Sequence, residues 1–466
     1  MVKKSLMVLV IGFMGSLLQA NQVKEDNQNL IKNLEINKNM IRVIANPTFS
    51  KTYLKQNFFA KYDEDVDLSK LSYSIVTIPF IMNVIPMIWV SDNTYYIDEM
   101  DKDLFESLNT VQKVFQAFYP TQKWTGKLVP RKLVDNSKKN KKSDTISVLF
   151  SHGLDAVYTS FHNRDKKQVL ITIGGGDINL FRKSMWENVQ KQCKNYAQKN
   201  GHTNAFVKSN FMTFRKYKHL NSLSPEIKNW FGETSQSLSY TGLAAPIAYL
   251  NGSPQLLIAS TRTSDFPYPY GTHPIIDNNI AYGGITIDHD GPEVNRLDKI
   301  REIATIAKTH NLEKPMLRVC WGKDLNGGNC NTCEKCLRTI VELLVENQIP
   351  EDYGFKISLD EAIKHARKKS PGTDKLKPGL VWHWSCIKHA AQQTLAHNQA
   401  ITNGNLKEFL VWISNLDLNK YKKEATNRFE QEREALATLW KRAAQRTFNP
   451  QDLAMIHPQA VAHALH

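Results

Sequence analysis

The sequence predicts an α/β fold: a parallel sheet covered by helices, preceded by a small α+β domain and followed by a helical region. Three observations support this prediction. Between residues 144 and 348, short apolar runs alternate with longer amphipathic stretches, which is typical of a parallel sheet. Residues 40–130 combine short apolar runs with one long amphipathic stretch, and residues 355–466 show almost only helical patterns. With 466 residues, the chain is long enough for two or three domains.

The composition narrows the class of protein before any motif is considered. Hydrophobic residues make up 41% of the chain and aromatic residues 10%, which is enough for a sizeable core and excludes wholesale disorder. The 22 Gly and 18 Pro residues exclude collagen-like and low-complexity chains. The formal net charge of +15 favours anionic partners, namely nucleotides, nucleic acid or a membrane surface, without choosing among them.

The first 20 residues resemble a secretory signal. Two lysines precede an apolar run from Leu6 to Leu18, and a small-residue cleavage site ends at Ala20. The sequence therefore predicts export to the periplasm or the medium. The alternatives are an uncleaved anchor or a buried helix, which would leave the protein anchored or in the cytoplasm. Further along, Ile75–Val90 is apolar but interrupted by two prolines, so no later membrane span is expected.

Residues 40–130 are expected to form the small α+β domain. Apolar runs predict strands at Tyr73–Ile78, Met87–Val90 and Tyr95–Ile97. The spacing of apolar residues predicts an amphipathic helix over Asp101–Phe118. The basic, polar segment Arg131–Lys142 is interpreted as a solvated linker, with an anion-binding arm as the alternative.

The central region, residues 144–348, is expected to alternate strands with helices on both faces of a parallel sheet. The expected strands are Ile146–Phe150, Val169–Ile173, Phe206–Val207, Leu256–Ser260 and Met316–Val319, and the expected helices are Leu180–Asn200, Leu238–Leu250 and Val294–Ala307. Residues 355–466 are expected to be almost wholly helical, including a long polar helix near Lys420–Arg446.

Four cysteines crowd into one short loop of the central region. They follow the spacing C-x9-C-x2-C-x2-C at Cys320, Cys330, Cys333 and Cys336. A Zn²⁺ ion takes four thiolates about 2.3 Å away in a tetrahedron, and such a complete shell suits a structural rather than a catalytic zinc. Disulfides and redox-active cysteines are the alternatives. Cys193 and Cys386 are expected to be single buried thiols.

The turn after the first strand of the central region has the form of a phosphate-binding loop. Ile146–Phe150 runs into Ser151–Asp155, and a helix is expected to follow. The unpaired N–H groups at a helix N-terminus attract phosphate, and Gly153 permits close approach of the backbone. By position alone, any strand–turn–helix unit would fit this description.

The wider sequence adds a resemblance. The segment SVLFSHGLDAVYTS resembles the SGGxDS loop of the PP-loop (N-type) ATP pyrophosphatases. Together with the four-cysteine loop, it is similar to the branch that contains 7-cyano-7-deazaguanine synthase. The chain is more similar still to an uncharacterised set of synthase-like PP-loop proteins, through SDFPYPYGTHP (264–274), HDGPEVNR (289–296), CEKCLRT, IPFIMNVIPMIWV and FYPTQKWTGKL. The likeness covers about residues 70–345.

The resemblance implies a PP-loop type of sheet, a structural zinc on the four cysteines, and ATP with Mg²⁺ held by Ser151, His152, Gly153 and Asp155. It also implies that ATP activates a substrate carboxylate for amidation. Two positions depart from the family loop, because His152 replaces a Gly and Ala156 replaces a hydroxyl residue. His152 adds a side chain where the backbone should approach phosphate, although its imidazole can itself donate to phosphate. Ala156 removes one hydrogen-bond donor.

One further segment supplies candidate catalytic residues. His289 and Asp290 are expected to act in catalysis together with Asp155, and Glu293 and Arg296 are expected to contact the substrate. The alternative for the acidic residues is a cap at the N-terminus of the following helix, where carboxylates complement the helix dipole. The alternative for Arg296 is an ion pair with Glu293, three residues before it on the helix.

A second segment supplies candidate substrate contacts. Arg262 and Asp265 follow the strand Leu256–Ser260 at its C-terminal end, where open α/β sheets bind ligands. His273 closes an aromatic loop that is suited to stacking a planar ring. A plain turn and ordinary loop packing are the alternatives.

These observations predict an ATP-dependent ligase that adenylates a carboxylate or carbonyl of a small molecule, releases pyrophosphate and transfers the acyl group to ammonia or another amine. The first alternative is a catalytically degenerate nucleotide- or ligand-binding protein on the same fold. The second is an RNA-modifying or RNA-binding protein, for which the positive charge is the only support. The ligase prediction conflicts with export, because exported proteins leave the cytoplasmic pool of ATP. It also requires the loop after Phe150 and the cysteines to lie side by side.

Overall fold

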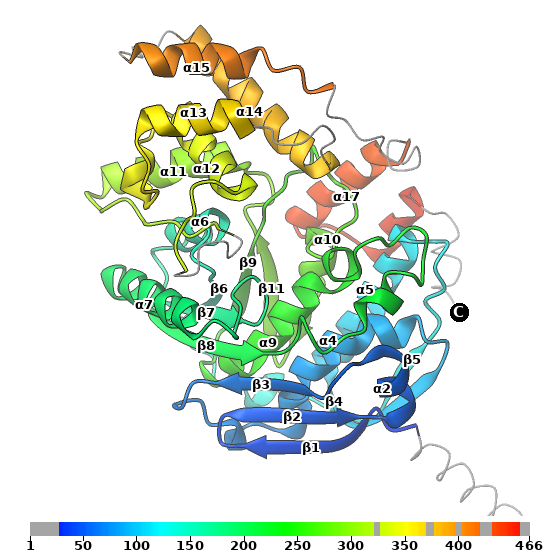
Figure 1. Cartoon of the computed structure of the whole chain (residues 1–466). Helices are drawn as coiled ribbons and strands as arrows, with labels where there is room; N and C mark the ends of the chain where they lie inside the picture. Colours follow the sequence, from blue (N-terminus) through cyan, green and yellow to red (C-terminus); the bar gives the residue numbers. More distant parts are fainter. Residues whose placement is uncertain (1–27, 321–326, 370–376, 398–402, 420–430, 457–466) are drawn as a thin grey trace, which may run out of the picture.

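The computed structural model describes residues 28–320, 327–369, 377–397, 403–419 and 431–456, so the predicted signal segment, residues 1–20, lies outside the described residues. The described chain is an α/β structure in which helices cover both faces of the central strands of a nine-stranded mixed sheet (Figure 1). The strands of this sheet are β1 (Ile31–Asn37), β2 (Met40–Ala45), β3 (Phe58–Tyr62), β6 (Ile146–Leu149), β7 (Gln168–Gly174), β8 (Thr203–Ser209), β9 (Gln255–Ala259), β10 (Ala281–Tyr282) and β11 (Ile285–Asp290). Their order is β1-β2-β3-β8-β7-β6-β9-β11-β10.

The remaining elements surround this sheet. A separate two-stranded parallel sheet consists of β4 (Thr94–Asp101) and β5 (Lys127–Val134). The α-helices are α2 (Pro47–Tyr53), α3 (Tyr73–Val76), α4 (Ile78–Trp89), α5 (Lys102–Phe118), α6 (Leu154–His162), α7 (Lys183–Lys199), α8 (Tyr217–Leu220), α9 (Gln236–Leu250), α10 (Pro274–Asp277), α11 (Arg296–Thr309), α12 (Glu334–Val345), α13 (Leu359–Lys369), α14 (Pro378–Ala396), α15 (Gly404–Ser414) and α17 (Arg433–Ala444). A π-helical turn (Phe231–Ser235) precedes α9, and 3-10 turns lie at Leu68–Lys70, Ser137–Lys139, Pro350–Tyr353 and Pro450–Met455.

The five central strands are parallel and contain a topological switch point. They lie in the order β8-β7-β6-β9-β11, with β6 between β7 and β9. From β6 the chain first builds β7 and β8 on one side and later builds β9 and β11 on the other. Ligands of open α/β sheets bind outside the carboxyl ends of the strands at such a point. The turn Ser151–Asp155 leaves β6 there.

Alternation of side chains along the central strands divides the core into two layers. In β7, Ile171 faces the layer of α4 and α9, whereas Leu170 faces the layer of α6 and α7. In β9, Leu256 and Ile258 face the first layer and Leu257 faces the second. Because successive side chains of a strand point to opposite faces and both faces are covered, such strands are continuous apolar runs in the sequence.

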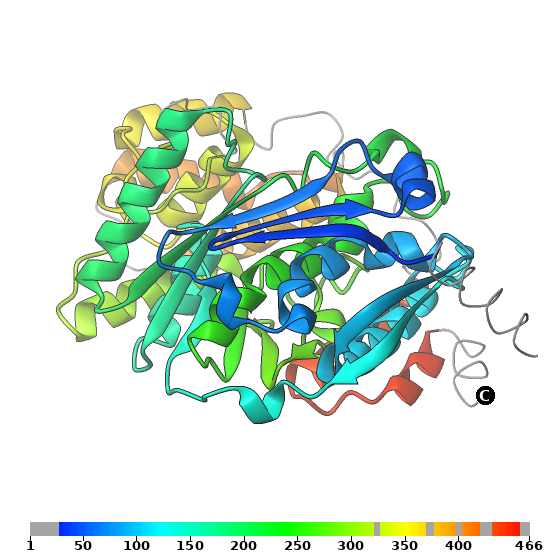
Figure 2. The ribbon, with the colours of Figure 1, turned by 90° about the horizontal axis from the view of Figure 1, so that it is seen from below.

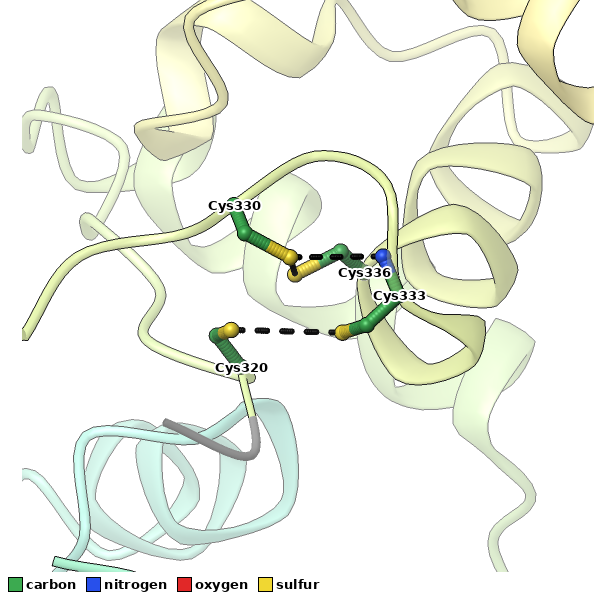
Figure 3. A group of neighbouring side chains, drawn as sticks. All are labelled: Cys320, Cys330, Cys333 and Cys336. Carbon is green, nitrogen blue, oxygen red and sulfur yellow. Dashed lines mark hydrogen bonds between the residues drawn. The ribbon is translucent and has the colours of Figure 1, made fainter. Parts of the chain in front are cut away.

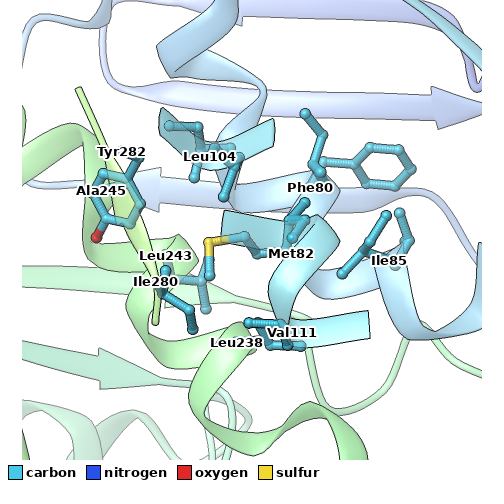
Figure 4. Packing of buried hydrophobic residues seen from close by; sticks show 14 of the residues in the cluster. Phe80, Met82, Ile85, Leu104, Val111, Leu238, Leu243, Ala245, Ile280 and Tyr282 are labelled. Carbon is cyan, nitrogen blue, oxygen red and sulfur yellow. The ribbon is translucent and has the colours of Figure 1, made fainter. Parts of the chain in front are cut away.

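The N-terminal strands extend the same sheet. β3 pairs antiparallel with β8, and β2 and β1 continue the sheet beyond it (Figure 2). Side chains of α4, α5 and α9 interdigitate in the first core layer, where Met82, Leu104 and Leu243 are fully buried (Figure 4). Residues 40–130 and 144–348 therefore contribute to one sheet and one core layer.

Two predicted strands, Tyr73–Ile78 and Met87–Val90, are wrong, because these residues lie mainly in the helices α3 and α4. Every residue of α4 is buried, and a helix that is buried on all sides has no amphipathic period by which the sequence could identify it. Pro79 lies in the first turn of α4, where proline is tolerated. The Asn83 amide group donates to the Pro79 carbonyl (2.8 Å) inside this helix.

Most other predicted elements are confirmed. In the N-terminal part, β4 contains the predicted strand Tyr95–Ile97, and α5 corresponds to the predicted helix Asp101–Phe118. The strands β6, β7, β8 and β9 correspond, in this order, to the predicted strands Ile146–Phe150, Val169–Ile173, Phe206–Val207 and Leu256–Ser260. The helices α7, α9 and α11 correspond to the predicted helices Leu180–Asn200, Leu238–Leu250 and Val294–Ala307. Met316–Val319 is not a strand. Its Arg318 N–H donates to the His152 carbonyl (2.7 Å) and its Leu317 N–H donates to the Tyr353 carbonyl (2.9 Å). The backbone of this segment thus forms hydrogen bonds with the turn at His152 and with the 3-10 turn at Tyr353, and not with a strand.

The segment Arg131–Lys142 is not a solvated linker. Its first residues belong to β5, and Asn136 is 1% exposed. The Asn136 side chain donates to the Ser74 hydroxyl (2.9 Å) and to Asp101 Oδ2 (2.8 Å). These buried contacts attach the segment to α3 and to the start of α5.

The C-terminal region is helical where it is described. It contains α13, α14, α15 and α17, which confirms the predicted helical character. Of the long helix predicted near Lys420–Arg446, residues 420–430 lie outside the described residues, and α17 accounts for most of the rest. None of the helices in the described ranges combines the length and the apolar character that crossing a bilayer requires.

Candidate functional site

The turn Ser151–Asp155 connects the carboxyl end of β6 to α6. Ser151 is exposed, and Gly153 is the N-cap residue, so no side chain caps α6. The first N–H groups of such a helix have no partner within the helix, and together with the positive end of the helix dipole they attract anions. The turn therefore has the backbone features of a phosphate-binding loop.

His152 turns its side chain away from this surface. Its φ of +61° lies in the left-handed region, which glycine adopts most easily. The imidazole lies against the rings of Phe150 (centroid distance 5.5 Å) and Tyr196 (5.4 Å), and both ring nitrogens are closed off from solvent. Burial and the charge of Arg318 lower the pKa of His152 to about 4, so the ring is neutral at physiological pH. Only the backbone of His152 can therefore contact a bound phosphate.

Asp155 is held by two cations of α11. Arg296 Nη1 lies 2.9 Å from Asp155 Oδ2, and Lys299 Nζ lies 3.4 Å from Oδ1. The Thr261 hydroxyl, from the loop after β9, also donates to Oδ2 (3.2 Å). Burial alone would raise the pKa of Asp155, but Arg296 and Lys299 together lower it. The carboxylate is therefore ionised where α6, α11 and the loop after β9 meet.

Arg296 is a buried link between helices. Besides Asp155, its Nε donates to both carboxylate oxygens of Glu342 (3.0 Å each) and its Nη2 donates to the Thr339 hydroxyl (2.8 Å). Its side chain is 2% exposed. The alternative pairing with Glu293 is not formed, because Glu293 instead accepts from the Ser264 hydroxyl (2.9 Å).

The alternative caps of α11 are not formed either. The N-cap residue is Asn295, whose side chain accepts from the N–H groups of Leu297 and Asp298. Asp290 belongs to the end of β11, outside the helix. Capping by Asn295 is the usual arrangement for a helix N-terminus and leaves the upstream carboxylates for other contacts.

The expected catalytic residues His289 and Asp290 point in opposite directions. They are consecutive in β11, so their side chains face opposite sides of the sheet. His289 Nδ1 lies 2.7 Å from Asp277 Oδ2 in a buried pair, and the His289 ring lies beside that of Trp440. Asp290 accepts from the Thr159 hydroxyl (2.7 Å) of α6. The two residues are therefore not brought together at one centre.

His273 belongs to the layer that contains His289. Its Nδ1 accepts from the Ile275 N–H (3.2 Å) and thereby caps α10. Its ring contacts those of Trp440 (4.4 Å) and Phe118 (5.2 Å). His273 is thus enclosed by packing on the face of the sheet opposite to α6.

Arg262 lies in the loop after β9, at the same edge of the sheet as Ser151–Asp155. Its guanidinium carbon lies 4.9 Å from the centre of the Phe266 ring and 4.4 Å from that of Tyr270. No carboxylate of the described residues forms an ion pair with it. A guanidinium stacked between aromatic rings keeps its in-plane N–H groups for an anion. Asp265, further along the loop, is exposed and lines a separate cavity of about 270 Å³ beside α14.

The four predicted metal ligands form one compact group. The Sγ–Sγ distance is 3.9 Å between Cys320 and Cys333 and 4.0 Å between Cys330 and Cys336 (Figure 3). All four sulfur atoms lie within 4.8 Å of one another, and all four residues are free thiols. Thiolates about 2.3 Å from one tetrahedral ion lie about 3.8 Å apart. The four cysteines can therefore hold a metal ion such as zinc.

The electrostatics of the group favour a bound cation. Hydrogen bonding with Cys333 and burial raise the pKa of the Cys336 thiol, and the neighbouring sulfur atoms raise it further. Crowded thiolates are stable only when a cation compensates their charge, as a metal ion does. Of the other two thiols, Cys193 is buried, as predicted, and Cys386 is partly buried.

The cysteine group lies beside the turn Ser151–Asp155, as predicted. Arg318, two residues before Cys320, donates its N–H to the His152 carbonyl (2.7 Å). Its Nε donates to the Gly327 carbonyl (3.2 Å), on the other arm of the cysteine loop. α12, which carries the partners of Arg296, begins directly after Cys333. The cysteine loop and the candidate phosphate loop are therefore in direct contact.

Sequence reasoning missed two cations and one histidine near this edge. Lys299 follows Arg296 by three residues on α11. This spacing could have predicted that both cations lie on one face of the helix. Lys335 follows Cys333 in the first turn of α12, and burial lowers its pKa although the charges of Asp177 and Asp155 act in the opposite direction. His383 of α14 had no signal in the sequence, because only the packing of the C-terminal region brings it to the site.

Comparison of the chain with protein-family models, with curated proteins and with solved structures finds no match. The function must therefore be argued from the site itself.

Proposed function

We propose that the protein is an ATP-dependent ligase that adenylates a carboxylate or carbonyl of a small molecule and transfers the acyl group to ammonia or another amine. One observation carries the proposal: the uncapped N-terminus of α6 lies at the switch point of the central parallel strands, beside Arg296 and Lys299, the cations that pair with Asp155. A triphosphate is the kind of ligand that suits such a position. The resemblance of the loop to the PP-loop sequence points to the same ligand.

The residues at this edge suit different parts of the reaction. In this reaction the N–H groups of Ser151–Asp155 would hold the pyrophosphate of ATP, and the Asp155 carboxylate would hold Mg²⁺. Mg²⁺ supplies compensation of phosphate charge when it is bound. Arg262, whose guanidinium has no acidic partner among the described residues, would hold the substrate carboxylate or the departing phosphate.

Calorimetric titration with ATP–Mg²⁺ tests the nucleotide site. We expect wild type to bind, Asp155→Asn to bind at least tenfold more weakly, and the exposed control Asp165→Asn to match wild type. Restoring the hydroxyl with Ala156→Ser should tighten binding by about tenfold, because a hydrogen bond to a charged group contributes about 1.5–3 kcal/mol. Absence of binding in both wild type and Ala156→Ser contradicts the nucleotide site.

Turnover is tested separately by pyrophosphate release. Wild type is incubated with ATP–Mg²⁺, ammonium chloride and a library of small carboxylates, and AMP and pyrophosphate are measured. We expect stoichiometric AMP and pyrophosphate with a subset of the carboxylates and none without them. ADP and phosphate as products would exclude adenylation.

A degenerate binding protein is the second candidate function. It is favoured by the engagement of Asp155 with Arg296 and Lys299 and by the missing hydroxyl at Ala156. This candidate predicts ATP binding in the calorimeter together with no pyrophosphate release from any carboxylate in the library. The two assays together therefore distinguish the ligase from the binder.

We propose further that the metal is a structural zinc. Four sulfur ligands complete a tetrahedral shell and leave no open position for a substrate. The group would then fix the contact between Arg318 and His152 rather than take part in the reaction. Elemental analysis should find about one zinc per chain and no stoichiometric iron or copper.

A further inference from the structure

α14 of the C-terminal region approaches the candidate site with its first two turns. A Cβ atom at Gly379 would lie 3.2 Å from Arg262 Nη2 and 3.8 Å from the Phe266 ring. His383 follows Gly379 by four residues, so it lies on the same face of α14, one turn further along. The helix thus directs His383 to the side on which Arg262 lies.

The imidazole of His383 is buried but forms no hydrogen bond within the described ranges. The residue is 8% exposed, and its ring lies 4.8 Å from that of Trp382. Within the described ranges, neither ring nitrogen has a hydrogen-bond partner. Neither nitrogen is closed off from solvent, in contrast to both ring nitrogens of His152. Both ring nitrogens therefore retain some surface that is exposed to solvent.

Cations from three elements act electrostatically on His383. They are Arg262 from the loop after β9, Arg296 and Lys299 from α11, and Arg338 from α12. Burial lowers the pKa of His383 well below its usual value, and these cations lower it further. A neutral imidazole carries a nitrogen lone pair that can accept a proton.

We propose that His383 is the general base of the amine-transfer step. The inference rests on the ligase function proposed above. In this step the amine nitrogen attacks the acyl carbon of the adenylate and the C–N bond forms. The bond from the acyl carbon to the AMP oxygen breaks, and AMP leaves with the electron pair. The proton of the attacking nitrogen passes to a ring nitrogen of His383 and then to water.

The test compares His383→Gln with wild type in the two half-reactions. The control is His389→Gln, because His389 is an exposed histidine on the same helix. The carboxylate library and ATP–Mg²⁺ serve as probes of the first half-reaction, measured as exchange of labelled pyrophosphate into ATP. Ammonium chloride and hydroxylamine serve as alternative nucleophiles for the second. Hydroxylamine is weakly basic and reacts with acyl adenylates without a base.

We expect His383→Gln to leave pyrophosphate exchange and hydroxamate formation within twofold of wild type. Formation of the amide from ammonia should fall by about 100-fold or more, which is the usual contribution of a general base. Free imidazole should partly restore this rate in His383→Ala. Retention of the pyrophosphate exchange shows that the variant is folded and binds its first substrates.

Three results would overturn the inference. An unchanged rate with ammonia would exclude the base role while leaving the ligase function intact. Parallel loss of exchange, hydroxamate and amide would assign His383 to the first half-reaction or to folding. Absence of pyrophosphate exchange in wild type with every carboxylate would remove the proposed function and this inference with it.

Discussion

At the carboxyl ends of the central strands, burial and neighbouring cations determine whether a single side chain is charged. Asp155 stays ionised in a partly buried position because Arg296 and Lys299 lower its pKa against the effect of burial. Its interaction with these cations therefore stabilises the fold above the pKa of an unfolded aspartate and is lost as the pH falls through the lower folded value. His152 shows the opposite case, because burial excludes its charged form.

His152 should make the protein sensitive to mild acid. Its folded pKa of about 4 lies below the usual 6.5, so the unfolded chain binds the additional proton between these values. The free energy of unfolding should therefore fall with decreasing pH from about 6.5 to 4, by about 3 kcal/mol in total. In His152→Asn this component disappears, and asparagine tolerates the left-handed backbone. Urea unfolding at pH 7.5 and 4.5 measures the difference.

The exposed histidine His389 provides the control for that experiment. His389→Asn should lose stability on acidification to the same extent as wild type, because this side chain is solvated in both states. An equal acid sensitivity of wild type and His152→Asn would show that the imidazole is not buried as the structure has it.

At the scale of elements, the first core layer depends on the close approach of α4 and α9. Gly242 of α9 lies against Met82 of α4, and a Cβ atom at Gly242 would lie 2.7 Å from the Cβ of Met82. Gly242→Ala should therefore destabilise the fold by about 1–3 kcal/mol through overpacking, although alanine favours helices. Urea unfolding provides the measurement.

Gly404→Ala is the matched control, because nothing lies within 4 Å of a Cβ atom at this position of α15. There the same substitution should stabilise the protein by about 0.4–1 kcal/mol. If both variants shifted stability in the same direction, the close packing of α4 on α9 would be contradicted.

The elements also show where sequence reasoning succeeds and fails. The central strands, α5 and the cysteine loop were predictable because their patterns are local: continuous apolar runs, a helical period and a short ligand spacing. α4 was not, because burial on all sides removes the period that separates helices from strands. The link from Arg296 to Glu342 joins residues 46 apart in the sequence, and only the packing of α11 on α12 establishes it. The opposite orientations of the His289 and Asp290 side chains could have been predicted only if β11 had been recognised as a strand.

The whole molecule is built from two core layers that share one sheet. The first layer contains the N-terminal strands and helices and also receives α17, where Trp440 Nε1 donates to the Pro292 carbonyl (3.0 Å). The second layer runs from α6 and α7 through the cysteine group to α15. Because Cys320, Cys333 and Cys336 belong to this second layer, the cysteine group lies between the sheet and the helical region.

Removal of the metal should therefore loosen the second layer and the candidate phosphate loop together. Without a cation, the four thiols lose their common partner and the contact between Arg318 and His152 loses its support. A ligand that binds only the folded state at a thousand times its Kd stabilises that state by about 4 kcal/mol, so chelation should lower the free energy of unfolding by an amount of this order. Cys333→Ser should reproduce the effect, whereas Cys386→Ser, outside the group, should not.

Calorimetric titration of the chelated protein should also show weakened ATP–Mg²⁺ binding, and adding zinc back should restore it. Unchanged stability and unchanged nucleotide binding in a preparation shown to be metal-free would contradict this coupling between the cysteine group and the candidate phosphate loop.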